Sequence, residues 1–517
     1  MENVKILWVD DEIDVLRPQI LFLEQKGYNV DTTNNGSEAL EMVRENPYDI
    51  IFLDEQMPGL SGIETLEQIK SEYPNLPVVM ITKSEEETIM EEAIGSNIAD
   101  YLIKPVNPKQ ILLSLKKNLE NKKLRSEKST SQYQQSFSQL GMRISSGLDI
   151  DEWIEVYRQL VRWELELEKS ADPGIREVLT MQKNEANQVF AKFIEKNYTD
   201  WVGGKSNDKP VLSHTLLKEK LFPSLEGNKP VFLILIDNLR YDQWKTIQPV
   251  IEENYRIKSD EIYYSILPTV TQYARNALFS GLLPLEIQRK YPQFWLGEDD
   301  EGTKNQFEQE LLTEYLKRYG KHPKMSYTKV LNLNVGKKLV ENLPNLMNND
   351  FNVIVYNFVD MLSHARTEME IIRELADDES AYRSLTLSWF DHSPLKEVFE
   401  FLAEKRAEVI ITTDHGSVKV HEPVKVLGDR NTNTNLRYKT GKALQYNSKE
   451  VFVAKRPEDI YLPRTNVSSS FIFCKKNDFF AYPNNYNYYV NYYKNTFQHG
   501  GISLEEVLIP YITLSAK

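Results

Sequence analysis

The sequence predicts a multidomain α/β protein in which a helical segment separates two parts that each contain a parallel sheet. Three observations predict this. Strand-like and helix-like stretches alternate over residues 1–120. Residues 106–220 lack strand signals and carry apolar side chains at helical spacing. In residues 225–517, short apolar runs are followed directly by acids and histidines, as expected for strands that end at one crevice of an open sheet.

The first part alternates regularly between the two patterns. Strand-like runs cover residues 4–9, 28–33, 49–53, 77–82 and 99–103, and helical patterns lie near 14–26, 37–45, 62–72, 85–95 and 108–120. Five successive βα units of this kind predict a doubly wound parallel sheet, (βα)5, of flavodoxin-like order.

Polar side chains gather where these strands end. Asp10 and Asp11 follow the first strand, Asp54 follows the third, Thr82 ends the fourth and Lys104 follows the fifth. An acid at a strand end often only caps the next helix, so one alone indicates little. Three carboxylates in one crevice repel one another unless a hard cation lies among them, and oxygen ligands suit Mg²⁺. A lysine and a hydroxyl beside them are suited to bind phosphoryl oxygens.

This part resembles a response-regulator receiver domain. The matching strings are VDDE (9–12), LDEQMPGLSG (53–62) and KP (104–105), together with Thr82. The resemblance implies that Asp54 accepts a phosphoryl group from a sensor histidine kinase. It also implies a magnesium site at Asp10, Asp11, Asp54 and the Gln56 carbonyl, with Thr82, Lys104 and Tyr101 as the residues that respond to the phosphate.

The middle segment is expected to be a helical bundle and linker. Trp153, Tyr157 and Leu160 lie at helical spacing, Asp149 or Asp151 is placed to cap their helix, and a third helix is expected from Ile175 to about Tyr198. A helix-turn-helix output domain is the functional alternative. Its signature, a short recognition helix with basic residues at its start, is missing, so no direct promoter DNA binding is expected.

Composition narrows the class of protein further. The 517 residues carry a formal net charge of −14, which argues against a protein that coats nucleic acid. The N-terminus lacks the pattern of a secretory signal, and no apolar run approaches the length of a membrane span. The single cysteine, Cys474, cannot form an internal disulfide. We therefore expect a soluble cytoplasmic protein with no membrane partner.

Metal-ligand residues are the main feature of the C-terminal part. Asp237 follows the run VFLILI, Asp360 follows VIVYNFV, and Asp414 with His415 follows VIITT. Taken singly, a histidine at a strand end is more often a core residue, and a D-x-x-x-H pair is more often a surface pair. The full set of three aspartates, three histidines and one hydroxyl is enough for two tetrahedral zinc sites: Asp237, Thr271, Asp360, His364, Asp414, His415 and His499.

The order of these pieces resembles the alkaline phosphatase superfamily, and specifically its PglZ branch. The strings are LIDNLRYD (234–241), LPTVTQYARN (267–276), FVDMLSHA (358–365), TTDHG (412–416) and HGGISLEEVLIP (499–510). The resemblance implies an alkaline-phosphatase-like α/β domain with two Zn²⁺ ions. Asp360, His364 and His499 would hold one ion. Asp237, Asp414, His415 and the Thr271 oxygen would hold the other.

Thr271 is the expected nucleophile, and Thr269 competes with it. The superfamily pattern P-T-x-T favours the second threonine, which also opens a predicted helix whose N-terminus attracts phosphate. The expected chemistry is attack of Thr271 on phosphorus with a phosphothreonine intermediate. Arg275 and Asn276 are candidate substrate-binding residues, although packing on the helix is an equal alternative. His421 is a further candidate ligand.

Three other segments are candidates for shaping substrate choice. The loop 428–442 carries Arg430, Arg437, Lys439 and Lys442, which suggests either a polyanion site or a solvated loop. The stretch 479–493 is rich in aromatic residues, which suggests base stacking or ordinary packing. Residues 284–325 have the character of an insertion that covers the site.

The expected domains are a receiver at 1–120, a helical bundle and linker at 121–210, and a PglZ domain of the alkaline phosphatase superfamily at 211–517. This order resembles the PglZ-type response regulators of type IX secretion. The resemblance implies a phosphorylation-promoted homodimer and a zinc-dependent phosphodiesterase acting on nucleotides or oligonucleotides, although the choice between mono- and diesters is not readable. The alternative is a non-catalytic, metal-stabilised regulator that binds a sigma factor or a secretion-system protein.

Overall fold

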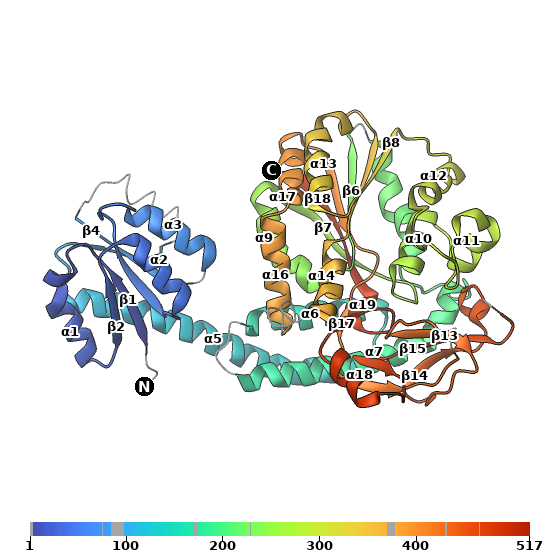
Figure 1. Ribbon diagram of the computed structural model, residues 1–517, viewed down its shortest axis with the longest axis horizontal. Coiled ribbons are helices and arrows are strands. Elements are labelled where there is room, and N and C mark those ends of the chain that lie inside the picture. Colours follow the sequence, from blue (N-terminus) through green and yellow to red (C-terminus); the bar gives the residue numbers. More distant parts are fainter. Residues whose placement is uncertain are drawn as a thin grey trace. The chain divides into compact units, whose positions relative to one another are not determined.

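The computed structural model describes residues 4–74, 76–83, 98–168, 173–227, 229–369, 378–429, 432–464 and 466–517 (Figure 1). The chain forms two compact units, Met1–Gln132 and Tyr133–Lys517, and each is described by itself. The division into domains at 1–120, 121–210 and 211–517 stays a prediction.

The first unit contains the predicted five-stranded parallel sheet, with strand order β2-β1-β3-β4-β5. Its elements are β1 (Lys5–Val9), η1 (Ile13–Leu16), α1 (Arg17–Gln25), β2 (Asn29–Thr33), α2 (Gly36–Glu45), β3 (Ile50–Asp54), α3 (Gly62–Glu72), β4 (Val78–Thr82), β5 (Asp100–Ile103) and the start of α5 (Pro108–Ser145). The β3 strand is buried along its whole length, because helices cover both faces of such a sheet. The helix expected at 85–95 lies outside the described residues.

Helices α5, α6 (Ile150–Leu167) and α7 (Pro173–Val202) make up the middle segment. Asp149 and Glu152 form a capping box that starts α6, as the sequence predicts. From Tyr133 onward these helices belong to the second unit and share its core. Trp153 packs edge-on against Phe190 of α7, with ring centroids 5.2 Å apart, and the Tyr264 hydroxyl donates a hydrogen bond to the Ile150 carbonyl.

A six-stranded sheet forms the centre of the second unit, in the order β7-β18-β10-β6-β9-β8. Its strands are β6 (Val231–Ile236), β7 (Tyr255–Tyr264), β8 (Met325–Val330), β9 (Phe351–Tyr356), β10 (Glu408–Thr412) and β18 (Leu508–Ala516). Strands β8, β9, β6 and β10 run parallel, and β18 pairs antiparallel with both β10 and β7. The carboxyl ends of the four parallel strands therefore meet at one edge, where such sheets bind ligands.

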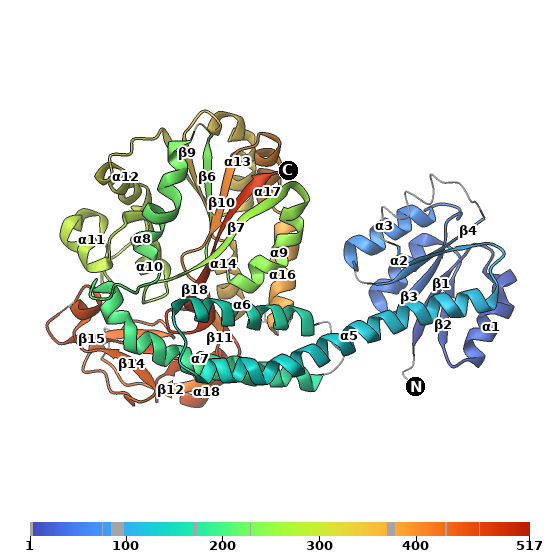
Figure 2. The same cartoon turned by 180° about the vertical axis from the view of Figure 1, so that it is seen from behind.

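Helices cover both faces of this sheet, as Figures 1 and 2 show. One layer holds α9 (Tyr241–Asn254), α13 (Leu333–Leu346), α16 (Glu379–Asp391) and α17 (Pro394–Glu404), and the other holds α8 (Ser213–Leu216), α10 (Thr271–Ser280), α11 (Pro284–Lys290) and α12 (Glu308–Arg318). Alternate residues of β6 enter different cores: Phe232 and Ile234 join the first layer, and Leu233 and Leu235 join the second. This explains why the VFLILI run is apolar without interruption.

Three small sheets lie between β10 and β18 in the chain. They contain β11 (Val418–Lys419) with β17 (Phe497–Gln498), β12 (Glu422–Lys425) with β16 (Asp478–Ala481), and β13 (Tyr438–Lys442), β15 (Ser469–Cys474) and β14 (Val451–Ala454). The segment also holds η5 (Pro457–Ile460) and α18 (Tyr486–Tyr493). Strand β17 immediately precedes His499, so its pairing with β11 helps to position that histidine beside the central sheet.

The basic loop and the aromatic stretch are partly structural. Arg437 and Lys439 are buried, so these two cations belong neither to an exposed polyanion site nor to a solvated loop. Arg430 lies outside the described residues. Residues 479–481 are buried in β16, whereas Tyr488 and Tyr489 on α18 are exposed. Packing therefore accounts for the start of the aromatic stretch and leaves its second half on the surface.

Burial of Lys439 predicts a pH-dependent stability. Desolvation lowers the pKa of Lys439 to about 8, while its ammonium donates to the Asn433 carbonyl at 2.8 Å. The unfolded chain binds this proton up to its ordinary pKa of about 10.4, so stability should rise between pH 8 and pH 10. We expect Lys439→Met to raise stability at pH 7 by up to roughly 3 kcal/mol and to abolish this rise. Thermal midpoints at pH 7 and pH 10 measure both effects, and parallel profiles for variant and wild type would contradict the assignment.

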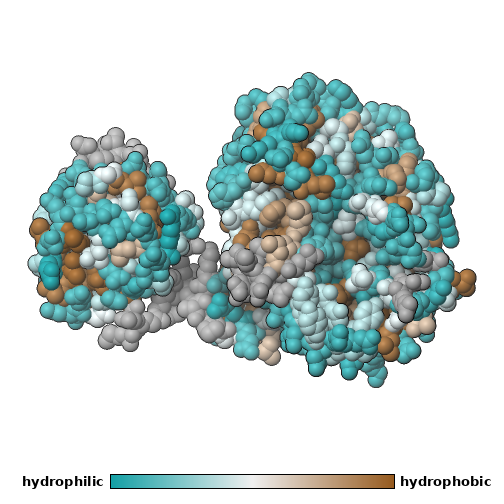
Figure 3. Space-filling model, viewed as in Figure 1, coloured by the Kyte–Doolittle hydropathy of each residue, from teal (hydrophilic) through white to brown (hydrophobic). Residues whose placement is uncertain are grey.

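The surface is mainly hydrophilic on the face shown in Figure 3, with apolar residues scattered over it. Among the described helices, none combines the length and the apolar character needed to cross a membrane.

Candidate metal centres

Segments that follow strands of the second unit bring the predicted ligands to the carboxyl edge of the six-stranded sheet. Asp237 follows β6, Asp414 and His415 follow β10, and Asp360 lies in the first turn of α14 (Phe358–Glu368), directly after β9. Asn238 turns the chain after β6 with a φ of 64°, a conformation that asparagine tolerates better than most residues. Its amide nitrogen lies 3.4 Å from Asp360 Oδ1, so the ends of β6 and β9 are tied together.

The first ligand group consists of Asp360, His364 and His499, whose ligand atoms all lie within 4.8 Å of one another. Nε2 of His499 is 3.5 Å from Asp360 Oδ1, and Nε2 of His364 is 3.6 Å from Asp360 Oδ2. Nδ1 of His499 lies 3.3 Å from the Thr269 carbonyl, an arrangement that orients the ring and leaves Nε2 to act as a ligand. Burial and the neighbouring His415 lower the pKa of His499 to about 3, so the ring is neutral, as a metal ligand must be.

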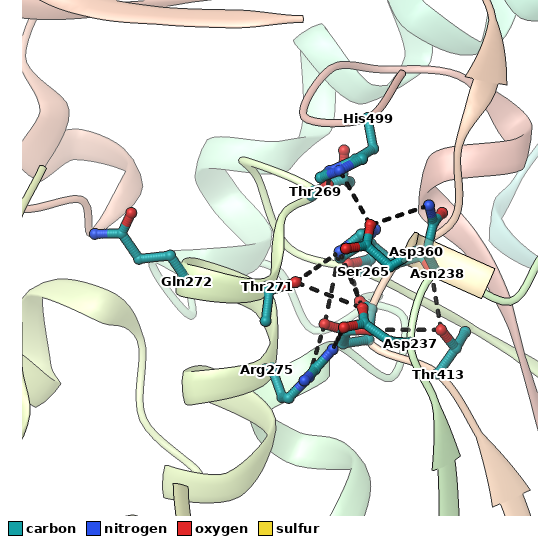
Figure 4. Close-up of polar contacts among 12 residues, drawn as sticks. Asp237, Asn238, Ser265, Thr269, Thr271, Gln272, Arg275, Asp360, Thr413 and His499 are labelled. Atoms are coloured by element: carbon teal, nitrogen blue, oxygen red, sulfur yellow. Dashed lines mark hydrogen bonds and ion pairs between the residues drawn. The ribbon is translucent and has the colours of Figure 1, made fainter. Parts of the chain in front are cut away.

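The second group consists of Asp237, Asp414 and His415, all of them buried. His415 Nε2 lies 3.8 Å from Asp237 Oδ1 and 3.6 Å from Asp414 Oδ2. The hydroxyl of Thr271 lies 3.2 Å from the same His415 nitrogen and 3.5 Å from Asp237 Oδ1 (Figure 4). The two groups are neighbours, because the rings of His415 and His499 stack with centroids 4.4 Å apart.

Both groups fit zinc in their donor chemistry and spacing. Each combines carboxylate oxygens with imidazole nitrogens, the usual ligands of a zinc ion. Ligands about 2.0–2.1 Å from a tetrahedral ion lie roughly 3.4 Å from one another. The four histidine–aspartate separations given above are 3.5–3.8 Å, and all ligand atoms of each group lie within 4.8 Å of one another. His421, the further candidate, falls in neither group among the described residues.

Arg275 lies behind the second group and is completely buried. Its guanidinium contacts Asp237 Oδ2, lies 3.0 Å from Asp414 Oδ2 and reaches Glu308 at 3.5 Å. Burial, opposed in part by Arg275, raises the pKa of Asp237 well above its ordinary value. Burial would also raise the pKa of Asp414, but Arg275 and His415 outweigh it and lower that pKa to about 2. Asn276 is buried as well, and its amide donates to the carbonyls of Gln272 and Lys304.

The two threonines have different surroundings. The Thr269 hydroxyl donates to the Gly501 carbonyl and accepts from the Gly500 amide, both at 3.0 Å, so it holds the loop that carries His499. Thr271 is the first residue of α10, and its hydroxyl faces the second ligand group. In Figure 4 the next side chain, Gln272, points away from the centre, and its amide donates to the Leu296 carbonyl.

The receiver unit has its own acidic group. Ligand oxygens of Asp10, Asp11 and Asp54 all lie within 4.8 Å of one another, and Lys104 Nζ is 2.9 Å from Asp10 and 3.1 Å from Asp54. Burial and the nearby Asp10 raise the pKa of Asp54 to about 6, despite Lys104. This all-oxygen set fits Mg²⁺.

The remaining receiver residues of the predicted set lie around this group. Gln56 is exposed two residues beyond Asp54, and Tyr101 is half-buried on β5. The Thr82 hydroxyl donates to Glu55 at 3.1 Å.

The family model of the BREX system PglZ alkaline phosphatase-like domain matches residues 216–514. The chain belongs to this family. Models of the PorX response regulator linker domain and of the response regulator receiver domain match residues 123–202 and 6–116. The three matches together give the chain the architecture of PorX-like response regulators: a receiver, a PorX-type linker and a PglZ domain. An α/β receiver fold followed by an alkaline phosphatase-like α/β domain is thereby confirmed.

Two of the similar curated proteins match about a quarter of the chain or less. ResD of Bacillus subtilis is 38% identical over 114 residues, which are 22% of this chain and 47% of ResD. ZraR of Klebsiella oxytoca is 39% identical over 123 residues, which are 24% of this chain and 28% of ZraR. Both are transcriptional regulatory proteins, and the chain spans less than half the length of each.

Solved structures of receiver domains also match part of the chain. The CheY-like receiver domain from Methanospirillum hungatei is 26% identical, covers 23% of this chain and 96% of its own, and gives a TM-score of 0.23. The receiver domain from Clostridium thermocellum is 31% identical, covers 23% and 98%, and also gives a TM-score of 0.23.

Several side chains around the PglZ centre carry no clear signal in the sequence. For Asn238, the sequence indicates a place near the centre only through its position directly after the candidate ligand Asp237. Glu308, which contacts Arg275 and lies 2.7 Å from the Asn305 amide, comes from a helix with an ordinary amphipathic pattern. Thr413, whose hydroxyl accepts from the Leu239 amide at 3.0 Å, was visible only as part of the TTDHG string.

Proposed function

We propose that the chain is a two-component response regulator whose PglZ domain is a zinc-dependent phosphodiesterase acting on nucleotides or oligonucleotides. In this proposal a sensor histidine kinase phosphorylates Asp54, phosphorylation promotes a homodimer, and the protein regulates type IX secretion. The family membership supports a hydrolase of the alkaline phosphatase superfamily. The zinc dependence and the diester substrate are the finer parts of the proposal.

The observation that carries the proposal is the position of the Thr271 hydroxyl. Thr271 is the first residue of α10, and the positive end of that helix dipole favours a phosphate group. The hydroxyl also lies 3.2 Å from one ligand atom, His415 Nε2, and 3.5 Å from another, Asp237 Oδ1. A purely structural metal centre needs no hydroxyl at this point.

The metal ligands, Thr271 and Arg275 have different roles in the proposed reaction. Zinc held by the two groups would supply Lewis-acid stabilisation of the charge that develops on oxygen. Thr271 Oγ would form the bond to phosphorus and give up its proton, which Asp237 Oδ1, 3.5 Å away, is placed to accept and which ends on the leaving alcohol. The bond to the leaving alcohol breaks, and water then cleaves the phosphothreonine. Arg275 stays behind the carboxylates, because its guanidinium is already bonded to Asp237 and Asp414.

The test is hydrolysis of a panel of short oligonucleotides and cyclic dinucleotides by the full chain. We expect turnover that a chelator removes and that added zinc restores, since the candidate ligand atoms are histidine nitrogens and carboxylate oxygens. A chain that binds zinc but cleaves no member of the panel, with or without a phosphodonor, would overturn the proposal. It would favour a metal-stabilised regulator that binds a sigma factor or secretion-system protein.

Phosphorylation of the receiver has a separate test. With a small-molecule phosphodonor and Mg²⁺, the wild type should gain one phosphoryl group by intact-mass measurement, and Asp54→Asn should gain none. Asp14→Asn, an exposed acid on η1, is the matched control and should behave as the wild type does. Phosphorylation of Asp54→Asn to the wild-type level would place the acceptor elsewhere.

A further inference from the structure

The short helix α19 (Leu504–Val507) lies between the linker helix α7 and two loops of the metal centre, the one that carries His415 and the one that carries His499. It belongs to the HGGISLEEVLIP string, of which the ligand assignment uses only the histidine. The two consecutive acids of this helix, Glu505 and Glu506, are both buried, with 3% and 0% of their surface exposed. Buried carboxylates need partners, and the partners of these two lie on opposite sides.

Glu505 is held by the linker. Its carboxylate lies 3.1 Å from Lys183 Nζ and accepts a hydrogen bond from the Asn187 amide at 3.1 Å. The side-chain oxygen Oδ1 of Asn187 in turn accepts a hydrogen bond from the backbone amide of Leu504 at 2.7 Å. One turn of α7 therefore binds both the side chain and the backbone at the start of α19.

Glu506 and the backbone of α19 hold the metal-ligand loops. Glu506 Oε1 accepts from the Gly501 amide at 2.9 Å, two residues beyond His499. The Glu506 carbonyl accepts from the amide of Gly416, which directly follows His415. A methyl group on Gly416 would fall 2.0 Å from the Glu505 carbonyl oxygen, so the two backbones are in direct contact. A shift of α19 cannot occur without moving both loops.

Lys183 also belongs to a wider ionic cluster. Glu164, Asp242 and Glu379 have metal-like spacing, but Lys183 lies 2.8 Å from Glu164, and Arg240 and Arg383 pair with the other acids. These cations already neutralise the cluster, so it is an ionic contact between linker and PglZ domain and not a third metal site.

We propose that Asn187 and Lys183 of the linker are positioning residues for the zinc centre, acting through α19 on the loops of His415 and His499. Groups that orient metal ligands from outside the coordination shell commonly change metal affinity by about 10–100-fold. The linker is then part of the metal centre, and any change in α7 is transmitted to zinc affinity. The zinc half of this inference rests on the proposed function; the mechanical half does not.

The first experiment is hydrogen exchange on the metal-free full chain. Asn187→Ala should speed exchange in the peptides covering 413–417 and 499–503, and Lys183→Met should act in the same direction. Gln188→Ala is the matched control, since this amide is on the same helix but exposed. Unchanged exchange in both loops for both variants would overturn the proposal, whatever the activity of the protein.

The second experiment measures zinc affinity by competition with a chelator. We expect about a tenfold weaker affinity for Asn187→Ala and no change for Gln188→Ala. Faster loop exchange with unaltered affinity would refute the positioning role and leave only a packing role. A wild type that binds zinc but hydrolyses no substrate would refute the proposed activity while leaving both of these outcomes decidable.

Discussion

Replacing Thr271 by alanine is expected to lower kcat on the best diester substrate by on the order of 10³-fold or more, because removal of a nucleophile leaves only binding and electrostatic stabilisation. The hydroxyl lies 3.2 Å from His415 Nε2, and no other threonine of the P-T-x-T string is free to replace it. Thr269 is committed to Gly500 and Gly501. Steady-state kinetics with saturating zinc measure the effect.

Two variants make this result specific. Thr271→Ser keeps a hydroxyl and should retain substantial activity. Gln272→Ala removes a side chain that points away from the centre, so its rate should be close to that of the wild type (Figure 4). Zinc loading separates chemistry from folding: in saturating zinc, Thr271→Ala should still load both sites through the remaining aspartate and histidine ligands. If Thr271→Ala kept the full rate, the nucleophile assignment would be wrong.

The sequence predicted the receiver sheet well because its strands are short, apolar and regularly spaced. All five strands lie within one residue of the predicted positions, and Asp54 ends β3 as expected. The clustering of the candidate ligands was also predictable, since most of them directly follow a strand or lie at the start of the next helix, and His364 lies one turn after Asp360 on α14. Tertiary contacts then bring together residues as distant in the chain as Asp360 and His499.

Contacts between distant segments were not predictable in the same way. The sequence predicts a helical bundle and linker in the middle of the chain, but it does not indicate that helices α6 and α7 share a continuous core with the central sheet. Burial of Arg437 against Glu506 was equally hidden, because a cation in a polar loop gives no sign of a buried partner 69 residues away. Periodicity reports the face of an element that is buried, but not the element that covers it.

Arg275 illustrates the same limit and gives the second large prediction. As a cation one turn into the helix that Thr271 opens, it is a natural candidate to bind substrate oxygens. The structure instead buries it completely against Asp237, Asp414 and Glu308. Arg275→Met removes the cation and leaves three buried carboxylates, so metal-free protein should lose about 3–5 kcal/mol of stability.

Zinc should reverse much of that loss. A bound divalent ion neutralises Asp237 and Asp414 in place of the guanidinium, so the gap in thermal midpoint between Arg275→Met and wild type should be wide in chelator and narrow in saturating zinc. Arg289→Met, an exposed arginine on α11, is the control and should change neither midpoint by much. An equal gap in both conditions would mean that Arg275 supports the fold independently of the metal. No gap in either would mean that the carboxylates do not depend on it. The predicted asymmetry, by contrast, requires the arginine and the ion to share the same two carboxylates, and a substrate-binding arginine would not produce it.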